Sequence, residues 1–467
     1  MTETRKERDS LGEVDVPAEA LYGAETMRAV MNFPISGAPM PREFIAAMGL
    51  IKAAAAAVHH KAGRLEAPVA AAIIQAAGEV AANGLDEHFP IDVFQTGSGT
   101  STNMNANEVI ANRAMQLLGG GSGGAGAVRV HPNDHVNMGQ SSNDVIPTAL
   151  HIAAALAITR ELLPALVALR DALQAKADEF DGVIKIGRTH LMDAVPIRLG
   201  QEFSGYAAQV ARAGELLRKA TDRLCELPLG GTAVGTGLNA PEGFATAVCE
   251  ILGENAGLPF REAPNHFAAA GARDAALAVS AALRSAGLAM GKVASDIRLL
   301  ASGPRCGLGE LLLPAVQPGS SIMPGKVNPV ICETVIQVAC QVVGNDAAVA
   351  AGATGGVGSI LELNVAMPMI TANLLGSIKL LTNAARVFAD RCVGGIVANE
   401  LRCREIVEQS LAMVTVLAPQ IGHEAAADIA RKAYQTGRTI REMCLAHDVL
   451  PPDELDALLD TSRQTGK

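Results

Sequence analysis

Five short polar and glycine-rich segments stand out in a chain that is otherwise apolar and helical in character. They are TGSGTSTNMNANE (96–108), HPNDHVNMGQSSND (131–144), GRTHLMD (187–193), LGGTAVGTGLN (229–239) and GSSIMPGKVNP (319–329). They lie where helical patterns begin or end, and a helix N-terminus offers unpaired N–H groups to anions. They are therefore the candidate parts of an anion-binding site.

Short hydrogen-bond donors and one compact cation dominate these segments. Collected in one place, such groups would hold two carboxylates with little added net charge. Any single Ser, Thr or Asn is more commonly a helix cap or a turn residue. The prediction of a dicarboxylate site therefore rests on several such clusters occurring in one chain. The candidate donors are Ser98, Thr100, Asn103, Ser141, Ser142, Asn143, Thr189, Lys326 and Asn328.

Two other kinds of site fit the segments poorly. In GSSIMPGK, five residues separate Gly319 from Gly325, where a phosphate-binding loop needs four, and Val327 replaces its Ser or Thr. The pair His131 and His135 has the i,i+4 spacing of metal ligands, but Pro132 makes a helix there doubtful. We therefore predict neither a nucleotide site nor a metal site.

Composition and charge narrow the class of protein. The chain has 467 residues, of which 49% are hydrophobic and only 3% aromatic, so small aliphatic side chains must fill long packed helices. Its net charge of −10 opposes non-specific binding to nucleic acid or to an acidic membrane. Eight cysteines are scattered without a C-x-x-C pair, which argues against zinc and iron–sulfur sites and fits a reducing cytoplasm.

The apolar periodicity predicts which elements position the clusters. Residues 1–40 suggest an irregular arm, 41–84 two or more helices, 89–102 a loop, 103–118 a helix, and GGGSGGAG (119–126) a flexible connector. Four cap residues from Ser141 to Asp144 begin a long helical run to about Phe180, with a kink expected at Pro164. Further long segments are expected at about 197–226, 264–302, 327–351 and 360–391, and shorter helices from about 397.

Five such long segments imply an elongated helical bundle. Several are apolar nearly all round, which suggests burial against other subunits. The charged N-terminus does not resemble a signal peptide. Apolar stretches such as Ile51–Val58 are too short to span a bilayer, so the expectation is a soluble cytoplasmic protein.

The polar segments resemble those of the fumarase and aspartase superfamily of lyases. GSSIMPGKVNP is similar to the superfamily's signature loop, and the other clusters occur in the same order along essentially the whole chain. TGSGT (96–100) and Thr189-His190 resemble class II fumarate hydratases, since aspartases typically carry Gln in place of that His. Three other segments are also similar to aspartases. They are VNPVICE (327–333), Ala366-Met367 and GGIVANE (394–400).

The resemblance implies an all-α fold with three domains, expected at 1–140, 141–364 and 365–467. A central long five-helix bundle would form a twenty-helix core in a homotetramer, with each active site built by three subunits. The implied reaction is the reversible hydration of fumarate to L-malate, without a cofactor. Aspartate ammonia-lyase and a catalytically inactive scaffold remain as alternatives.

The resemblance also assigns roles to individual residues. Ser320 would be the base, acting as an alkoxide, and Lys326 and Asn328 would bind the carboxylate that becomes an aci-carboxylate. His190, paired with Glu333, would hold the departing water. The remaining substrate contacts would come from Ser98, Thr100, Ser141, Ser142, Asn143 and Thr189.

A second, peripheral dicarboxylate site is implied at His131, Asn133 and Asp134. The family often has two basic residues just before this motif, whereas this chain offers only Arg129. The glycine-rich loop around Ser320 lacks bulky anchors, and residues 317–326 are expected to be poorly ordered without a ligand.

Overall fold

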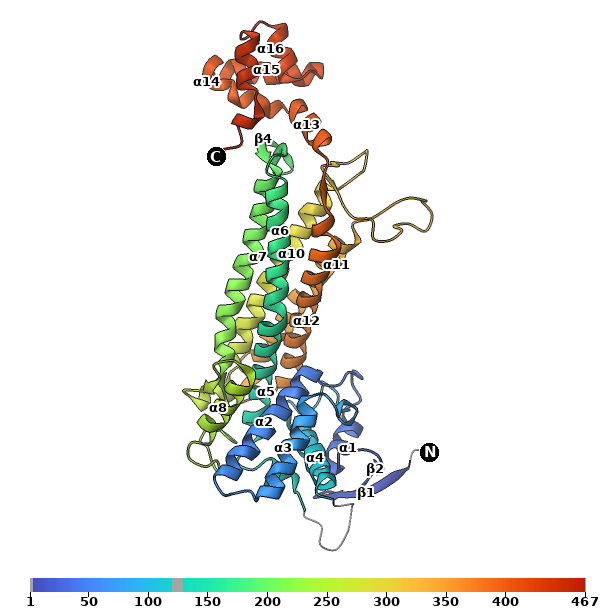
Figure 1. The fold of residues 1–467 in the computed structure, drawn as a ribbon, viewed down its shortest axis with the longest axis vertical. Coiled ribbons are helices and arrows are strands. Elements are labelled where there is room, and N and C mark those ends of the chain that lie inside the picture. The colour runs from blue at the N-terminus through green and yellow to red at the C-terminus, as the bar shows by residue number, and fades with distance from the viewer. Residues whose placement is uncertain (1–2, 120–128, 467) are drawn as a thin grey trace. The chain divides into compact units, whose positions relative to one another are not determined.

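The computed structural model describes residues 3–119 and 129–466, and within these ranges the chain is mostly helical (Figure 1). The predicted connector 119–126 therefore lies, apart from Gly119, outside the described residues. The chain forms two compact units. Unit 1 comprises residues 1–164, 215–287 and 340–382, and unit 2 comprises residues 165–214, 288–339 and 383–467.

The N-terminal part of unit 1 is more regular than its sequence suggests. An antiparallel hairpin precedes the first helix, so the expectation of an irregular arm over residues 1–40 is wrong. Alternating half-buried and exposed side chains along TRKERD and GEVDVP account for these strands. The elements are β1 (Thr4–Asp9), β2 (Gly12–Pro17) and α1 (Ala24–Asn32).

Three helices follow and pack against one another in unit 1 (Figure 1), and the first two are rich in alanine. The prediction of two or more helices over 41–84 is confirmed. One break, at residues 62–66, separates two helices, and Pro68 lies in the first turn of the second. The third helix begins at Thr100 rather than at residue 103, because Gly99 takes the left-handed conformation and serves as its N-cap. The helices are α2 (Arg42–Lys61), α3 (Ala67–Ala81) and α4 (Thr100–Leu117).

All five predicted long helical segments are present among the described residues. The first is continuous from residue 142 to residue 179, with a π-helical turn at Ile158–Leu162 just before Pro164. Proline has no N–H and clashes with the preceding turn, so the register slips there. The segments are α5 (Ser142–Ala157) with α6 (Leu163–Glu179), α7 (Leu199–Thr221), α10 (Asp274–Leu300), α11 (Val330–Ala353) and α12 (Met367–Arg391).

Short elements interrupt three of the predicted long segments. The segment expected from residue 197 begins in a strand, the one from 264 is broken at residues 272–273, and the one from 360 begins with a small hairpin. In unit 1 the short elements are β5 (Glu226–Leu227), α8 (Phe244–Ala256), β6 (Arg261–Glu262), α9 (His266–Gly271), β8 (Ser359–Ile360) and β9 (Leu363–Asn364).

Unit 2 contains two further small sheets and the predicted short C-terminal helices. The helices enclose their own apolar core, to which Ile186 of a strand also belongs. The elements are β3 (Ile184–Thr189), β4 (Met192–Arg198), β7 (Leu311–Leu312), β10 (Val397–Ala398), α13 (Glu400–Gln409), α14 (Ala418–Ile421), α15 (His423–Thr436), α16 (Ile440–Ala446) and α17 (Pro452–Leu458).

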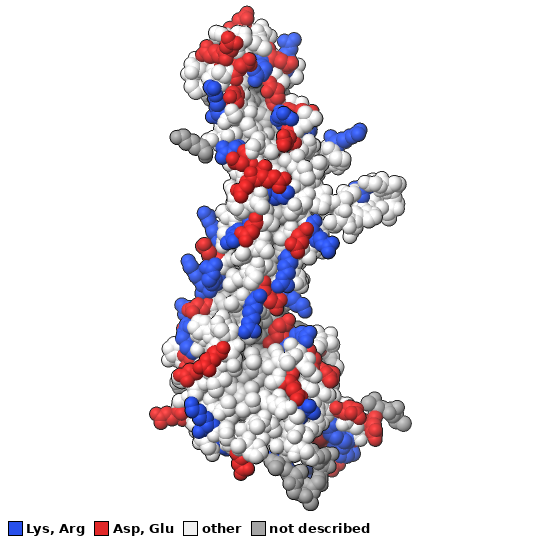
Figure 2. Space-filling view, viewed as in Figure 1, with Lys and Arg blue, Asp and Glu red and all other residues white. Residues whose placement is uncertain are grey.

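Three helical stretches are long and apolar enough, by length and composition, to cross a membrane. They are Ser142–Glu179, Asp274–Leu300 and Val330–Ala353. The expectation that the apolar stretches are too short is therefore wrong for these three. It considered uninterrupted apolar runs such as Ile51–Val58, whereas a spanning helix tolerates a few polar residues. Figure 2 shows charged side chains of both signs at intervals over the visible face of the molecule.

Candidate active site

Ser98 and Thr100 lie together at the start of α4. Their hydroxyl oxygens are 2.8 Å apart and hydrogen-bonded, and Ser98 is buried. Gly97 makes this arrangement possible because its backbone runs against that of Val365, where a Cβ atom would come within 1.9 Å of a carbonyl oxygen. The Gly97 carbonyl also accepts a hydrogen bond from the N–H of Met367, which anchors the loop to the start of α12.

Ser141, Ser142 and Asn143 occupy the N-terminal turn of α5, as the run of cap residues predicts. Ser141 is the N-cap and forms a reciprocal capping box with Asp144. The side chain of Asn143 donates a hydrogen bond of 2.8 Å to the carbonyl oxygen of Ala233. The N-termini of α4 and α5 are adjacent, since Gly99 lies against the side chain of Ile146.

Asp144 joins this turn to the glycine-rich segment 229–239, the one candidate polar segment with no predicted substrate contact. Its second carboxylate oxygen accepts hydrogen bonds from the N–H groups of Gly230 (3.0 Å) and Thr232 (2.8 Å). Burial raises the pKa of the Asp144 carboxyl, against the N–H groups of Ser141, Thr232 and Gly230 and the charge of Lys52, which lower it. The segment 229–239 is therefore a support for the α5 turn.

Lys52, which sequence reasoning missed, lies fully buried behind the same turn. Its ammonium donates hydrogen bonds to the side-chain oxygens of Asn137 (2.9 Å) and Gln140 (3.0 Å). Asn137 also accepts a hydrogen bond from Asn103 of α4. Burial lowers the pKa of Lys52 to about 7, although the charge of Asp144 opposes that shift. Lys52 therefore ties α2 and α4 to the loop that leads into Ser141.

Thr189 and His190 lie at the tip of the antiparallel β3–β4 hairpin of unit 2, which the sequence did not predict. His190 and Leu191 form the turn with φ angles of 58° and 61°. Both Thr189 and His190 are exposed. Arg188, immediately before them, makes two hydrogen bonds of 2.9 Å to the carboxylate of Glu310.

Ser320 lies in the long loop of unit 2 that precedes α11. Its hydroxyl oxygen accepts hydrogen bonds from the N–H groups of Ile322 (3.3 Å) and Met323 (3.0 Å). Lys326 is the only charged residue between Leu311 and Pro329, and its side chain is exposed. Figure 2 shows the loop as an almost uncharged projection. Glu333 lies in the first turn of α11.

The base of this loop is closed by two hydrogen bonds to the backbone of Gly319. The Gly319 N–H donates to the carbonyl of Lys326 (2.7 Å), and the side chain of Asn328 donates to the carbonyl of Gly319 (2.6 Å). A Cβ atom on Gly319 would come within 2.6 Å of the Lys326 carbonyl. The sequence signature thus corresponds to a closed loop with Ser320 at its base.

The predicted site residues fall into three groups within the chain. Ser98, Thr100 and Ser141–Asn143 gather at adjacent helix ends in unit 1, while unit 2 holds the His190 turn and the Ser320 loop. Within the described residues of unit 2, no hydrogen bond or ion pair joins His190 to Ser320, Lys326 or Glu333. The predicted pairing of His190 with Glu333 stays a prediction, because the resemblance places residues of three subunits in each site.

The predicted peripheral site forms an exposed turn in unit 1. The His131 ring nitrogen Nδ1 accepts from the N–H groups of Asn133 and Asp134, both at 3.2 Å. The side chains of His131 and Asp134 are 54% and 76% exposed, so both are accessible to a ligand. Within the described part of the chain, no group of three or more His, Cys, Asp or Glu residues could hold a metal ion.

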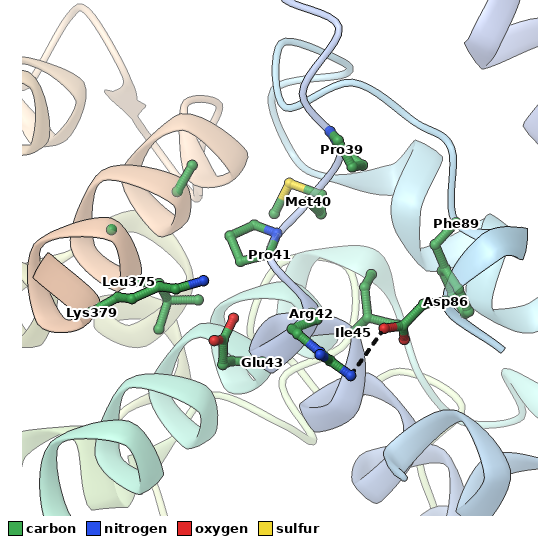
Figure 3. A pocket seen from close by; sticks show the side chains of 12 residues that line it. Pro39, Met40, Pro41, Arg42, Glu43, Ile45, Asp86, Phe89, Leu375 and Lys379 are labelled. Atoms are coloured by element: carbon green, nitrogen blue, oxygen red, sulfur yellow. Dashed lines mark ion pairs between the residues drawn. The ribbon is translucent and has the colours of Figure 1, made fainter. Parts of the chain in front are cut away.

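A cavity of about 400 Å³ lies elsewhere in unit 1, between the start of α2 and α12 (Figure 3). Arg42 and Asp86 form a 3.3 Å ion pair at this cavity, and Lys379 and Glu43 point toward it. None of the predicted site residues lines it. This cavity is therefore separate from the candidate active-site residues.

Comparison with known proteins places the chain in a family. Residues 12–344 match the lyase family, and residues 413–466 match the fumarase C C-terminus. Class II fumarate hydratase of Ralstonia nicotianae is 51% identical over 464 residues, covering 99% of this chain and 100% of the relative. The mitochondrial fumarate hydratase of Rattus norvegicus is 51% identical over 454 residues, covering 97% and 88%.

A solved structure agrees with these sequence matches. The class II fumarase of Schistosoma mansoni superposes with a TM-score of 0.94 at 40% identity, covering 98% of both chains. The helical fold expected from the resemblance is therefore confirmed. Together with the full-length relatives, these matches show that the chain belongs to the class II fumarate hydratase family of lyases.

Proposed function

We propose that this chain catalyses the reversible hydration of fumarate to L-malate with Ser320 as the base. The relatives named above support the reaction. One observation supports the role of Ser320. Its hydroxyl oxygen accepts hydrogen bonds from the backbone N–H groups of Ile322 and Met323. A serine hydroxyl is a weak base unless its anion is stabilised, and fixed N–H donors supply that stabilisation.

In the direction of dehydration, the Ser320 alkoxide takes the proton from C3 of malate. The electrons left behind delocalise into the neighbouring carboxylate, which becomes a doubly charged aci-carboxylate. Lys326 and Asn328 bind that group, and because its charge develops during the reaction, their contact favours the transition state over the ground state. The C2–O bond then breaks on the opposite face.

His190 assists the departing hydroxyl group, which leaves as water. Glu333 pairs with the imidazole, fixes its tautomer and raises its basicity. Thr189 and the donors at the ends of α4 and α5 hold the two carboxylates. These donors are Ser98, Thr100, Ser141, Ser142 and Asn143. Aspartate ammonia-lyase shares the carbanion step but releases ammonia instead of water. His190 and the similarity to fumarate hydratases favour water as the leaving group.

We propose a homotetramer in which three subunits build each site. The support is that large apolar side chains are exposed on every long helical segment. These are Val167, Leu216, Leu288, Leu299, Val343 and Val387. Of the domains proposed at 1–140, 141–364 and 365–467, the second holds four of the five long segments and the third begins with α12. In the proposed tetramer these five segments of each chain would form a twenty-helix core.

The tetramer also accounts for the three membrane-length helices without a membrane. Arg284 and Lys292 on α10 have side chains that are 48% and 50% exposed, and they would be costly in contact with lipid. We propose a soluble cytoplasmic enzyme of the tricarboxylic acid cycle.

His131, Asn133 and Asp134 form the proposed peripheral dicarboxylate site.

The Ser320→Ala variant tests the role of the base. Turnover of L-malate should fall by roughly 10³-fold or more, with an unchanged circular dichroism spectrum and oligomeric state. Ser321→Ala is a matched control, because Ser321 is the next residue in the same exposed loop. Full activity in Ser320→Ala would refute the proposed base, as would equal losses in both variants.

A further inference from the structure

Four charged side chains form a network in unit 2, in which Lys185 and Glu310 are buried and Arg188 and Glu202 are half-buried. The Glu310 carboxylate is fully buried, and it lies 2.9 Å from the Arg188 guanidinium and 3.3 Å from the Lys185 ammonium. Lys185, itself 1% exposed, also contacts Glu202 at 3.1 Å. Two carboxylates and two cations balance each other, so the network adds no net charge to the protein interior.

Glu310 is fixed by its backbone as well as by its side chain. Its N–H donates to the carbonyl of Leu300 at the end of α10, and its carbonyl accepts from the N–H of Asn399, both at 2.9 Å. The next two residues form β7, which pairs with β10. Glu310 is therefore a rigid point at the start of the segment that carries Ser320.

Arg188 links Glu310 to the tip of the β3–β4 hairpin. Its two parallel hydrogen bonds to Glu310 fix both the position and the plane of the guanidinium. The register of the hairpin shifts between Ile186 and Arg188, so regular strand pairing alone does not hold Arg188 in place. Thr189 and His190 follow directly.

The turn at the tip needs such support. His190 and Leu191 adopt φ angles of 58° and 61°, a left-handed conformation that side chains with a Cβ atom disfavour. Strained backbone of this kind persists only where the surroundings hold it. The neighbouring exposed residues Leu191 and Met192 offer no buried anchor of their own.

We propose that Glu310 is a positioning residue that acts through Arg188. It fixes the turn that presents Thr189 and His190 to the substrate, and it holds that turn against the segment leading to the Ser320 loop. The inference rests on the proposed function, since it assigns His190 to the departing hydroxyl group. If Glu310 were purely structural, its substitution would lower the stability of the protein. It would not slow the loss of water relative to the removal of the C3 proton.

The two steps of dehydration separate these interpretations. Ser320 removes the C3 proton, and the hydroxyl group then leaves as water with the help of His190. If His190 is displaced, the carbanion regains a proton at C3 more often than it loses water. In heavy water, the rate at which unreacted malate gains deuterium at C3 is compared at low conversion with the rate of fumarate formation. The ratio of these two rates then rises when His190 is displaced.

The test compares Glu310→Gln with wild type and with Glu202→Gln in L-malate dehydration. Glu202→Gln is the matched control, because Glu202 contacts Lys185 but not Arg188. For Glu310→Gln we expect kcat to fall by about 10- to 100-fold, the loss typical of a small misplacement, with KM within about threefold of wild type. The ratio of C3 deuteration to fumarate formation should rise several-fold, and Glu202→Gln should resemble wild type in both measurements.

Three results would overturn the inference. They are an unchanged kcat in Glu310→Gln, a lower kcat with an unchanged deuteration ratio, and equal effects of Glu202→Gln. Where Glu310→Gln yields too little folded tetramer, Arg188→Lys decides, since it keeps the charges balanced but loses the paired hydrogen bonds. Wild-type protein without activity on malate would instead refute the proposed function, so the two failures are distinguishable.

Discussion

The buried Lys52 makes the stability of the protein depend on pH in a way that one substitution should abolish. In the folded chain the pKa of Lys52 is about 7, because burial disfavours the ammonium, whereas an ordinary lysine has a pKa of 10.5. Between these values the unfolded chain binds more protons than the folded chain, so the free energy of unfolding rises with pH. Below about pH 7 both states are protonated and the full penalty applies.

The size of the effect follows from the shift. A lowering from 10.5 to about 7 corresponds to a penalty of about 5 kcal/mol, at about 1.4 kcal/mol per pKa unit. Between about pH 7 and about pH 9, the relief should be about 2 kcal/mol per chain. Lys52→Met removes this term but leaves the side-chain oxygen of Gln140 without its donor, a pH-independent loss of about 1–3 kcal/mol. The side-chain oxygen of Asn137 keeps its hydrogen bond from Asn103.

The assay is denaturant unfolding at one protein concentration across this pH range. The difference in free energy of unfolding between wild type and Lys52→Met should grow by about 2 kcal/mol in favour of wild type as the pH rises. Lys61→Met is the control, because Lys61 is exposed at the end of the same helix, and its curve should run parallel to that of wild type. A parallel curve for Lys52→Met would refute the argument.

Two predictions concern the Ser320 loop. Gly319→Ala should lower turnover by at least about tenfold with little change in melting temperature, because its Cβ atom would press on the Lys326 carbonyl in an exposed loop; normal turnover measured at saturating malate would contradict the closed loop. In crystals, residues 317–326 should give weaker electron density without a ligand than with a bound dicarboxylate. Equal order in both crystals would contradict the expected mobility.

The long helices could be predicted from the sequence because their apolar spacing is sustained over many turns. The helix cap at Ser141–Asp144 could also be predicted from the sequence, because cap residues act within one turn of the helix that they begin. By contrast, the β3–β4 hairpin has no Gly or Asn at its turn, where His190 and Leu191 take left-handed conformations. Its strands were therefore missed.

The buried charges were missed for a different reason. Lys52 is a lone lysine in an alanine-rich stretch, a pattern that usually marks an exposed side chain. Its partners Asn137 and Gln140 lie more than 80 residues away in the sequence. Arg188 and Glu310 are similarly distant from each other. Such pairings depend on tertiary structure, and local periodicity gives no signal for them.

The most direct test of the central claim is the substrate preference of the purified wild-type protein. It should form fumarate from L-malate and L-malate from fumarate, both followed by the ultraviolet absorbance of fumarate, without an added cofactor. L-aspartate should yield no ammonia under the same conditions. Ammonia from L-aspartate together with no fumarate from L-malate would contradict the account and identify the chain as an ammonia-lyase.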